Sequence, residues 1–337
     1  MFNHPDTSRI RDETVRPSIS LVMPLLNAMP YLHDAINCLD RQGISGLEVI
    51  AVDAGSTDGT RKVLEQAEDI KVVDAPGTSQ TEALNLGFSM ASGEILCWLN
   101  GDDILSDGTL GWVADWFSSH PDSQLLYGDS MAINEKGRRY GLRSNVRDGQ
   151  YQQLLHGDFI VQPSAFWRRE AFDEVGPLDE SLHFTFDYAF FLEVARQYEL
   201  HYEQRVFSFE RLRGGAKTAQ GGGPRAAELS TVMLRHGRDK VPMAFQPEVS
   251  ATHAQAGIRL VRSGQKEEGL RLLRQATAEG RPVFFTVVHL AASLLAGPKG
   301  TAEARLVSNW LRTTARRRTP IFPPSPPVSH SAQKPKQ

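Results

Sequence analysis

A run of five apolar residues, Ile95 to Leu99, ends abruptly in Asn100-Gly101-Asp102-Asp103. This pattern is typical of a buried strand that delivers carboxylates to the edge of a sheet. In an open α/β sheet, ligands bind at the carboxyl ends of the strands. Two adjacent carboxylates repel each other there unless a cation or hydrogen bonds hold them, which favours a divalent metal as a third partner. A plain turn is the alternative, because Asn-Gly and Asp-Asp are common turn residues.

Short apolar segments alternate with helical patterns over the first hundred residues. The sequence predicts strands at 19–23, 47–52, 70–73 and 94–99, with helices from Pro30, at 60–68 and from Ser79 to Ala91. This alternation favours a parallel sheet with right-handed crossovers, as in the nucleotide-binding half of an α/β domain. The loops at Pro24–Asn27, 53–60 and 100–103 are therefore expected at one edge of the sheet.

Further elements are expected downstream of this half. They are a helix at about 107–119, a strand at 124–129 that ends in Asp129, a hairpin over 130–145, a core strand at 165–167 and a helix that begins at Asp187. The hairpin is centred on Glu135-Lys136-Gly137, which has turn chemistry.

The charge of the chain is divided unequally along its 337 residues. Residues 1–249 carry 23 Lys+Arg against 36 Asp+Glu, whereas residues 250–337 carry 14 against 4. The acidic segment 1–249 is a poor candidate for nucleic-acid binding, and the basic segment 250–337 is a candidate for peripheral contact with an anionic membrane surface. Cys38 and Cys97 lie in apolar surroundings, which indicates reduced core residues in a cytoplasmic protein. Residues 1–17 lack the apolar segment of a signal peptide, and no apolar run reaches the ~20 residues of a membrane helix.

Several motifs recur here in an order and spacing that resemble the family 2 glycosyltransferases, which have the GT-A fold. The resemblance covers about residues 18–218. Its motifs are Pro24-x-x-Asn27, the Val-Asp-Ala-Gly-Ser-Thr-Asp-Gly-Thr loop at 52–60, Ala83-Leu84-Asn85-Leu86-Gly87 with Ala91-Ser92-Gly93-Glu94, the Trp98–Asp103 segment, and Gln162-Pro163-Ser164-Ala165-Phe166-Trp167. The implied fold is a mixed sheet with helices on both faces, a Rossmann-like nucleotide-binding architecture.

The resemblance implies a nucleotide-sugar donor site built from these motifs. Asp53 would read the nucleobase, Pro24 and Asn27 would shape the base and ribose slot, and Asp102 would lie near the ribose. Asp103 would bind a divalent metal, Mn²⁺ or Mg²⁺, beside the diphosphate. The remaining donor-site candidates are Gly55, Ser56, Asp58, Asn85 and Lys217. Asp58 is equally well explained as the N-cap of the helix that follows it.

Asp187 is the implied general base, since the resemblance places that base at a helix N-terminus, where backbone N–H groups favour the ionised form. An N-cap is the alternative role. Ala189 and Glu193 depart from the family pattern at positions of acceptor or phosphate contact. Lys217 belongs to the segment 209–218, which resembles the loop that closes over the diphosphate. In that segment Arg213 replaces a common His and cannot coordinate a metal.

Asp158 and Gln162 are candidates for the acceptor side, with a loop and a core strand as the simpler explanation. The implied activity is transfer of a sugar, with inversion, to a hydroxyl of a glycan or lipid-linked acceptor, as in polysaccharide or glycolipid assembly. A sugar-nucleotide pyrophosphorylase would need a Gly-rich, Arg/Lys-bearing loop after the first strand, which Pro24–Pro30 lacks. A non-catalytic protein that binds sugar nucleotides and recruits partners through its tail is the alternative from a different class.

Four domains or segments are predicted. A flexible N-terminus (1–17) precedes the GT-A domain (18–224), a helical region (225–319) and a disordered Pro-rich tail (320–337). The helical region is expected to contain two helix pairs between Ala254 and Arg316. Its helix at Val283–Leu295 is apolar almost all round and is either a core helix or one that lies in a membrane interface.

Overall fold

The computed structural model describes residues 16–143, 150–212, 217, 222–239, 241, 267, 270 and 271. The chain divides into two compact units, Met1–Lys240 and Val241–Gln337, and the elements described below belong to the first. The predicted disordered tail and, apart from residues 267, 270 and 271, the predicted C-terminal helices lie outside the described residues.

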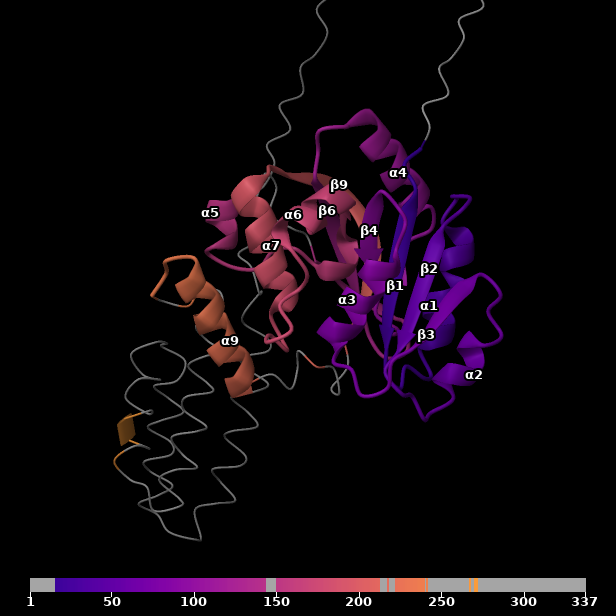
Figure 1. Ribbon diagram of the computed structural model, residues 1–337, viewed down its shortest axis with the longest axis horizontal. Coiled ribbons are helices and arrows are strands. Elements are labelled where there is room, and N and C mark those ends of the chain that lie inside the picture. Colours follow the sequence, from indigo (N-terminus) through magenta and orange to yellow (C-terminus); the bar gives the residue numbers. More distant parts are fainter. Residues whose placement is uncertain are drawn as a thin grey trace, which may run out of the picture. The chain divides into compact units, whose positions relative to one another are not determined.

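One mixed sheet organises the first unit (Figure 1). Its strands are β1 (Ile19–Leu25), β2 (Glu48–Asp53), β3 (Ile70–Asp74), β4 (Ile95–Trp98), β5 (Ile104–Leu105), β6 (Leu125–Ile133), β7 (Arg139–Arg143), β8 (Ala165–Arg168) and β9 (Leu200–Arg211). Their order is β3-β2-β1-β4-β8-β6-β9-β5, with β7 paired to β6. Strands β1 to β4 are parallel, as predicted, whereas β8 runs antiparallel to both β4 and β6.

Helices cover both faces of this sheet, which confirms the predicted fold class. Those in the first hundred residues are α1 (Leu32–Asn37), α2 (Thr60–Leu64) and α3 (Gln80–Met90). The others are α4 (Thr109–Ser119), α5 (Tyr151–Leu154), α6 (Arg169–Val175), α7 (Phe186–Gln197) and α9 (Gly222–Arg235), with 3-10 turns at Leu39–Arg41 and Gln162–Ser164. Ser79 caps α3 as predicted, since its hydroxyl accepts from Glu82 N–H while the Glu82 carboxylate accepts from Ser79 N–H.

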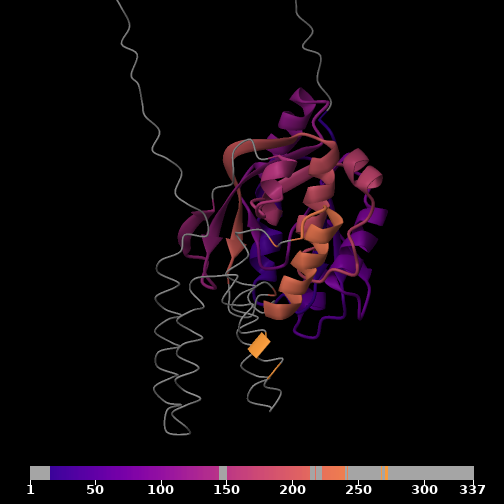
Figure 2. The same cartoon turned by 90° about the vertical axis from the view of Figure 1, so that its left-hand side faces the viewer.

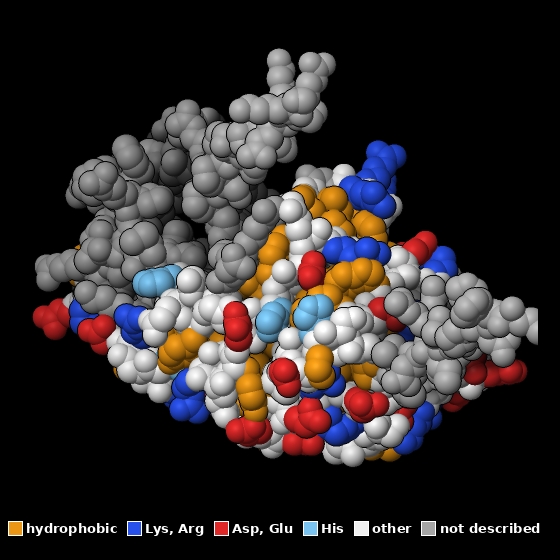
Figure 3. All heavy atoms as spheres, turned by 90° about the horizontal axis from the view of Figure 1, so that it is seen from above, with side chains coloured by type: hydrophobic (Ala, Val, Ile, Leu, Met, Phe, Trp, Pro, Cys, Tyr) orange, Lys and Arg blue, Asp and Glu red, His pale blue; other side chains and the backbone are white. Residues whose placement is uncertain are grey.

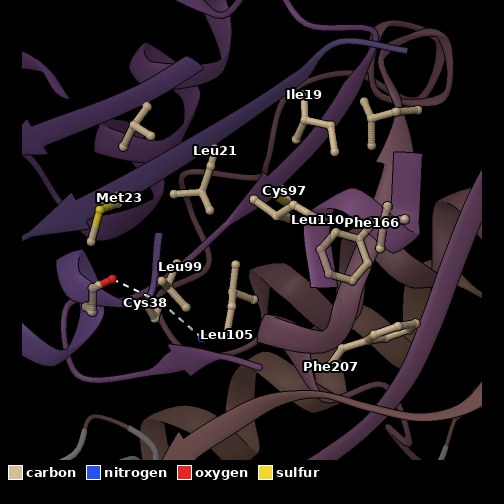
Figure 4. Packing of buried hydrophobic residues seen from close by; sticks show 14 of the residues in the cluster. Ile19, Leu21, Met23, Cys38, Cys97, Leu99, Leu105, Leu110, Phe166 and Phe207 are labelled. Carbon is tan, nitrogen blue, oxygen red and sulfur yellow. Dashed lines mark hydrogen bonds between the residues drawn. The ribbon is translucent and has the colours of Figure 1, made fainter. Parts of the chain in front are cut away.

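Alternating residues of β1 point to opposite faces. Leu21 and Met23 pack with α1 and α4 and with Phe166 and Phe207 of the far strands, in the core shown in Figure 4. Both cysteines are buried and free, as expected of core residues, and burial raises the pKa of the Cys38 thiol to about 11.

The other face of β1 is covered by α3 at very short range. A Cβ built on Gly87 of α3 would lie 2.4 Å from a Val22 methyl group, so only glycine allows this approach. An aromatic cluster continues this layer from α3 to α6 and α7, with Phe88 touching Trp98, Trp167 and Phe172, and Phe172 touching Phe190.

The sequence prediction missed β9 and misassigned its end. Residues 209–211, expected in a closing loop, are the last residues of this strand. The first seven residues of β9 are mostly half-buried or exposed, so they lack a clear apolar signal.

The helix predicted at 60–68 ends at Leu64, because the N–H groups of Gln66 and Ala67 bond three residues back in tighter turns.

Helix α9 lies beside α7 (Figures 1 and 2). The first compact unit extends to Lys240, whereas the predicted end of the GT-A domain at 224 falls inside α9. Among helices within the described ranges, none has the length and hydrophobicity that crossing a membrane requires. On the face drawn in Figure 3, acidic and basic side chains are interspersed among hydrophobic ones.

Candidate functional site

The loops after β1, β2 and β4 emerge at one edge of the sheet, as the sequence predicts. The strands are parallel, and the register pairs Leu25 with Asp53 and Val22 with Trp98, so their carboxyl ends lie side by side. Pro24 does not end β1 but pairs with Val52 within it. This edge is therefore the candidate ligand site.

Asn27 joins the first two of these loops. Its backbone N–H donates to Ser56 Oγ over 2.9 Å, and its side-chain Oδ1 accepts from Thr57 N–H over 2.9 Å. Asn27 has a φ of 52°, in the left-handed region that Asn tolerates better than most residues. The predicted slot residues Asn27 and Ser56 are thus brought together.

Asp53 ends β2 with a buried carboxylate. Its Oδ1 accepts from Ser56 N–H over 3.0 Å, and its Oδ2 lies 4.0 Å from the Arg61 guanidinium, which also pairs with Asp74 at 3.2 Å. Gly55 follows with a φ of +98°, a conformation in which glycine is favoured. The carboxylate predicted to read the base is fixed in place by its own loop.

Asp58 is engaged on both oxygens by backbone. Oδ1 accepts from Thr60 N–H at the start of α2 over 3.0 Å, and Oδ2 accepts from Met29 N–H over 2.8 Å. Partial burial raises the pKa of this carboxyl, but the hydrogen bonds from Thr60 and Met29 outweigh it and lower the pKa overall. Gly59, rather than Asp58, is the N-cap residue of α2, and the Asp58 carboxylate joins the start of this helix to the loop after β1.

The two acids after β4 have different surroundings. Asp103 is only 4% exposed, and its oxygens accept from Arg211 N–H over 2.9 Å and from the Asn100 side-chain amide over 3.1 Å. Burial, followed by the charges of Asp102 and Glu210, raises the pKa of Asp103 well above its ordinary value. Asp102 is half-buried. Asp102 is therefore the more accessible of the two carboxylates.

Arg211, the last residue of β9, holds this acidic turn. Its guanidinium, 1% exposed, donates to Asp102 O over 2.9 Å and to the Asp34 carboxylate over 2.8 Å, and it lies over the Tyr31 ring. It also donates to the carbonyl oxygens of Asn134 and Glu135 in the β6–β7 hairpin. One buried cation thus ties the turn to α1 and to the hairpin.

A chain of amides crosses the site from Lys217 to β4. Lys217 Nζ donates to Gln80 Oε1 over 3.0 Å, and Gln80 Nε2 donates to Asn100 Oδ1 over 2.9 Å. Asn100 Nδ2 lies 3.2 Å from Gln162 Oε1, and Gln162 Nε2 donates to Trp98 O over 2.8 Å. Gln162, proposed from sequence for the acceptor side, is therefore a buried anchor of the edge.

Lys217 is a partly buried cation among aromatic rings. Its Nζ lies 5.1 Å from the centre of the Phe186 ring. Burial lowers the pKa of Lys217 to about 8, although the charges of Asp187 and Glu228 oppose this shift. The carboxylates of Asp187 and Glu228 thus both act on the charge of Lys217.

Asp187 occupies the first turn of α7. Its Oδ1 accepts from Tyr188 N–H over 2.8 Å. Burial raises the pKa of Asp187, and the Tyr188 N–H and the positive charges of Arg225 and Lys217 reduce that rise. A buried carboxyl group whose pKa is shifted by burial and by two nearby cations is a candidate functional group.

Asn85 faces a different set of partners. Its amide accepts from Leu178 N–H and donates to Leu178 O and Glu180, each at 2.9 Å. These bonds fasten α3 to the turn before α7, so Asn85 supports the fold of the site.

Asp158, the other residue considered for the acceptor side, bonds within its own loop. Its Oδ1 accepts from Ile160 N–H over 3.2 Å.

Within the residues that the structure describes, no group of three or more His, Cys, Asp or Glu side chains could hold a metal ion. Mg²⁺ at nucleotide sites is usually bound by one or two carboxylates plus the phosphates of the ligand. One half-buried carboxylate, Asp102, fits that donor set. A metal here would arrive with the nucleotide.

A mixed sheet with helices on both faces and an acidic turn after β4 is the architecture of GT-A glycosyltransferases. Residues 20–176 match the model for Glycosyl transferase family 2. This match covers just under half of the chain, and it supports membership of the family 2 glycosyltransferases.

Two curated relatives are similar over about half of this chain. A PGL/p-HBAD biosynthesis glycosyltransferase of Mycobacterium bovis is 29% identical over 174 residues, 48% of this chain and 63% of the relative. An uncharacterised glycosyltransferase of Rickettsia conorii is 26% identical over 203 residues, 56% of this chain and 33% of the relative. The chain thus spans between a third and just under two thirds of these relatives.

Solved structures share the fold at low sequence identity. Residues 1–349 of S. aureus TarS in complex with UDP-GlcNAc match with a TM-score of 0.58 and 15% identity, over 89% of this chain and 92% of that one. The mannosyltransferase PcManGT of Pyrobaculum calidifontis, in complex with GDP-Man and Mn²⁺, matches with a TM-score of 0.51 and 20% identity, over 90% and 87%.

Sequence reasoning missed the contributions of Gln80, Arg225 and Glu228. Gln80 is the first residue of α3, and a position directly after the Ser79 cap signals a helix start rather than a ligand site. Arg225 and Glu228 belong to α9, which the sequence assigns to a separate helical region. Their proximity to Asp187 depends on chain folding over about 40 residues, which no local pattern reveals.

Proposed function

We propose that this protein transfers a sugar from a nucleotide-sugar donor to a hydroxyl acceptor, with inversion at the sugar carbon. The observation that carries the proposal is the meeting of four features at one sheet edge. They are the Asn27–Ser56 loop pair, the Asp102–Asp103 turn, Lys217 and Asp187. The family match over residues 20–176 supports this assignment.

Donor binding is proposed at the edge between β2 and β4. Asp53 and the Asn27 loop would hold the base and ribose, and Lys217 would attract the diphosphate. A divalent metal would be held by Asp102 together with the diphosphate, and it would neutralise negative charge as the diphosphate departs. The neighbours with UDP-GlcNAc and with GDP-Man and Mn²⁺ support a donor of this class.

Asp187 is proposed to take the proton of the acceptor hydroxyl as that oxygen attacks the sugar from the face opposite the diphosphate. General-base catalysis of this kind requires an ionised carboxylate within hydrogen-bonding reach of the hydroxyl. Lys217 and Arg225 favour the ionised form, because both cations oppose the effect of burial on the pKa of Asp187. The acceptor is proposed to be a glycan or a lipid-linked glycan.

A panel of nucleotide-sugars tests the activity, beginning with UDP-GlcNAc and GDP-mannose in the presence of Mn²⁺. Release of free nucleoside diphosphate that depends on an added glycan or lipid-linked acceptor is the expected result. Binding of the donor without release under all conditions would instead identify a non-catalytic binding protein.

The metal assignment is tested with the matched variants Asp102→Asn and Asp103→Asn. Calorimetry with UDP or GDP and Mn²⁺ is expected to show a loss of more than about 100-fold in metal-dependent affinity for Asp102→Asn. The loss for Asp103→Asn is expected to be about tenfold, because a residue that only orients a ligand has the smaller effect. Equal metal-dependent affinity for Asp102→Asn and wild type, with a large loss for Asp103→Asn, would identify Asp103 as the metal ligand.

The base is tested with Asp187→Asn, which preserves size but removes the basic oxygen. Turnover is expected to fall by ~10²–10⁴ while nucleoside diphosphate affinity stays unchanged. Thr185, rather than Asp187, is the N-cap residue of α7, so a purely structural role for Asp187 in the first turn would leave turnover nearly unchanged. A variant that keeps at least a third of wild-type turnover would show that Asp187 is not the base.

A further inference from the structure

The carboxylate of Glu228 on α9 is surrounded by donors from one short segment. Oε1 accepts from His183 N–H over 2.8 Å, and Oε2 accepts from Phe184 N–H over 2.7 Å. Oε2 also accepts from the Thr185 N–H and from the Thr185 hydroxyl, each at 3.1 Å. Three of the four donors converge on Oε2 and one binds Oε1, so both oxygens of the carboxylate are engaged.

The segment held in this way leads directly into α7. Thr185 is the N-cap residue of the helix and is 2% exposed, and its carbonyl accepts from Ala189 N–H over 2.9 Å. Its hydroxyl does not cap the helix, because it donates to Glu228 instead. The entry of α7, two residues before Asp187, is therefore fixed by a side chain from another helix.

Successive backbone N–H groups that converge on one point form an anion-binding concavity. Here the anion is built into the protein, about 40 residues further along the chain. An isolated α7 would leave these three N–H groups to water, and the backbone before Asp187 would be free to move.

Helix α9 also places charge around the two ionisable groups of the site. Arg225, one turn before Glu228, helps to hold Asp187 ionised, and Glu228 helps to hold Lys217 protonated. Lys217 is faced by Asp187 from α7 and Glu228 from α9. Burial and then the charge of Lys217 lower the pKa of His183, whereas the charge of Glu228 opposes this shift.

We propose that Glu228 is a positioning residue that fixes residues 183–185 and thereby orients Asp187 toward the acceptor. This role makes α9 part of the catalytic unit rather than of a separate appendage. The orientation of a catalytic group matters because misplacement by about 1 Å can lower a rate 100-fold. The catalytic part of this inference rests on the proposed function.

The first test compares hydrogen–deuterium exchange in the full-length wild type, Glu228→Gln and Arg235→Gln. The amide nitrogen of Gln cannot accept hydrogen bonds, so His183 N–H loses its partner if the amide oxygen takes the Oε2 position, and the other three donors lose theirs if it takes the Oε1 position. Arg235→Gln is the control, since it breaks the ion pair between the same helix and Asp179 without touching residues 183–185. Exchange at 183–185 and in the first turn of α7 is expected to rise at least tenfold in Glu228→Gln only.

A second variant keeps the test decisive if Glu228→Gln does not fold. Thr185→Val removes one donor to Glu228 at nearly constant shape, and it is expected to raise exchange at 183–185 by a smaller factor. Wild-type exchange rates at 183–185 in every variant that folds, or an equal rise in Arg235→Gln, would overturn the proposal.

Kinetics then separate positioning from simple stabilisation. Glu228→Gln is expected to lower kcat at least tenfold while the KM for the donor stays within threefold, and Arg235→Gln is expected to lower neither. A wild-type kcat in Glu228→Gln would refute the link to Asp187. If the wild type releases no nucleoside diphosphate from any donor, the proposed function fails, whereas the exchange comparison still decides whether Glu228 holds the segment.

Discussion

Replacement of Arg211 by Met tests whether a single buried cation holds the acidic turn in place. Met keeps much of the aliphatic length of Arg but none of its donors. The substitution removes hydrogen bonds to the carbonyl oxygens of Asp102, Asn134 and Glu135, and it removes the ion pair with Asp34. The Asp103 bond survives, because it comes from the backbone N–H of residue 211.

The magnitude follows from the burial of these groups. Each buried acceptor left without a donor costs about 1–3 kcal/mol. Asp34, 56% exposed, regains water and contributes little. Loss of one partner of a buried charged network typically costs about 3–5 kcal/mol, so we expect a decrease of that size in the free energy of unfolding. For a unit of this size the melting temperature would fall by about 6–20 °C, at about 2–4 °C per kcal/mol.

Urea unfolding followed by tryptophan fluorescence measures this decrease in the relevant unit. Trp98, Trp112, Trp116 and Trp167 belong to the first compact unit, and Trp310 is the fifth tryptophan of the chain. Arg16→Met is the matched control, because the Arg16–Asp115 pair is about half exposed and is expected to contribute at most about 1 kcal/mol. If the two variants differ by less than about 1 kcal/mol, Arg211 does not support the turn as argued.

Three further predictions concern Lys217, Gly87 and the C-terminal region. Burial holds the pKa of Lys217 at about 8, so the cation is present below that pH and is lost above it. Affinity for UDP or GDP is therefore expected to fall as the pH rises from 7 to 9.5, and Lys217→Arg, which stays charged, should abolish this fall. Gly87→Ala should destabilise by about 1–3 kcal/mol in urea unfolding, because the new Cβ overlaps a Val22 methyl group, whereas Gly141→Ala, with open space at its Cβ, should not. Truncation after Lys240 should leave nucleoside diphosphate affinity within about threefold, since the site lies in the first unit. The truncated chain should also lose affinity for anionic vesicles at low salt, and unchanged vesicle binding would contradict membrane contact through the basic region.

The sheet edge could be predicted from sequence because each part of it has a local signal. Apolar runs followed by Asp53 and by Asp102-Asp103 mark strand ends, and the alternation with helices fixes their direction. The relative exposure of Asp102 and Asp103 could not be predicted. It depends on Arg211, which reaches the turn from a strand more than 100 residues away.

The fold beyond β4 carries weaker signals. Strand β9 pairs along β6 while many of its side chains stay half-exposed, so the hydrogen bonds of its backbone to β6, which carry no apolar signal in the sequence, contribute to holding it beside the buried Phe207. Gln162 shows the converse case. Its polarity suggests a ligand contact, yet it is buried and bonded to Trp98 O and to Asn100, because the end of β4 needs these polar partners.

Glu228 shows why the surroundings of the proposed base, Asp187, are hard to predict from sequence. Three of its four donors are backbone N–H groups, which every residue except proline supplies, so no residue type at 183–185 marks them as partners. The carboxylate itself stands on a helix with no motif. A sequence comparison therefore identifies Asp187 as a candidate base but gives no sign of the group that orients it. The same carboxylate also helps to keep Lys217 protonated. A substitution at position 228 would therefore affect both the charge of Lys217 on the donor side and the orientation of the proposed base, Asp187.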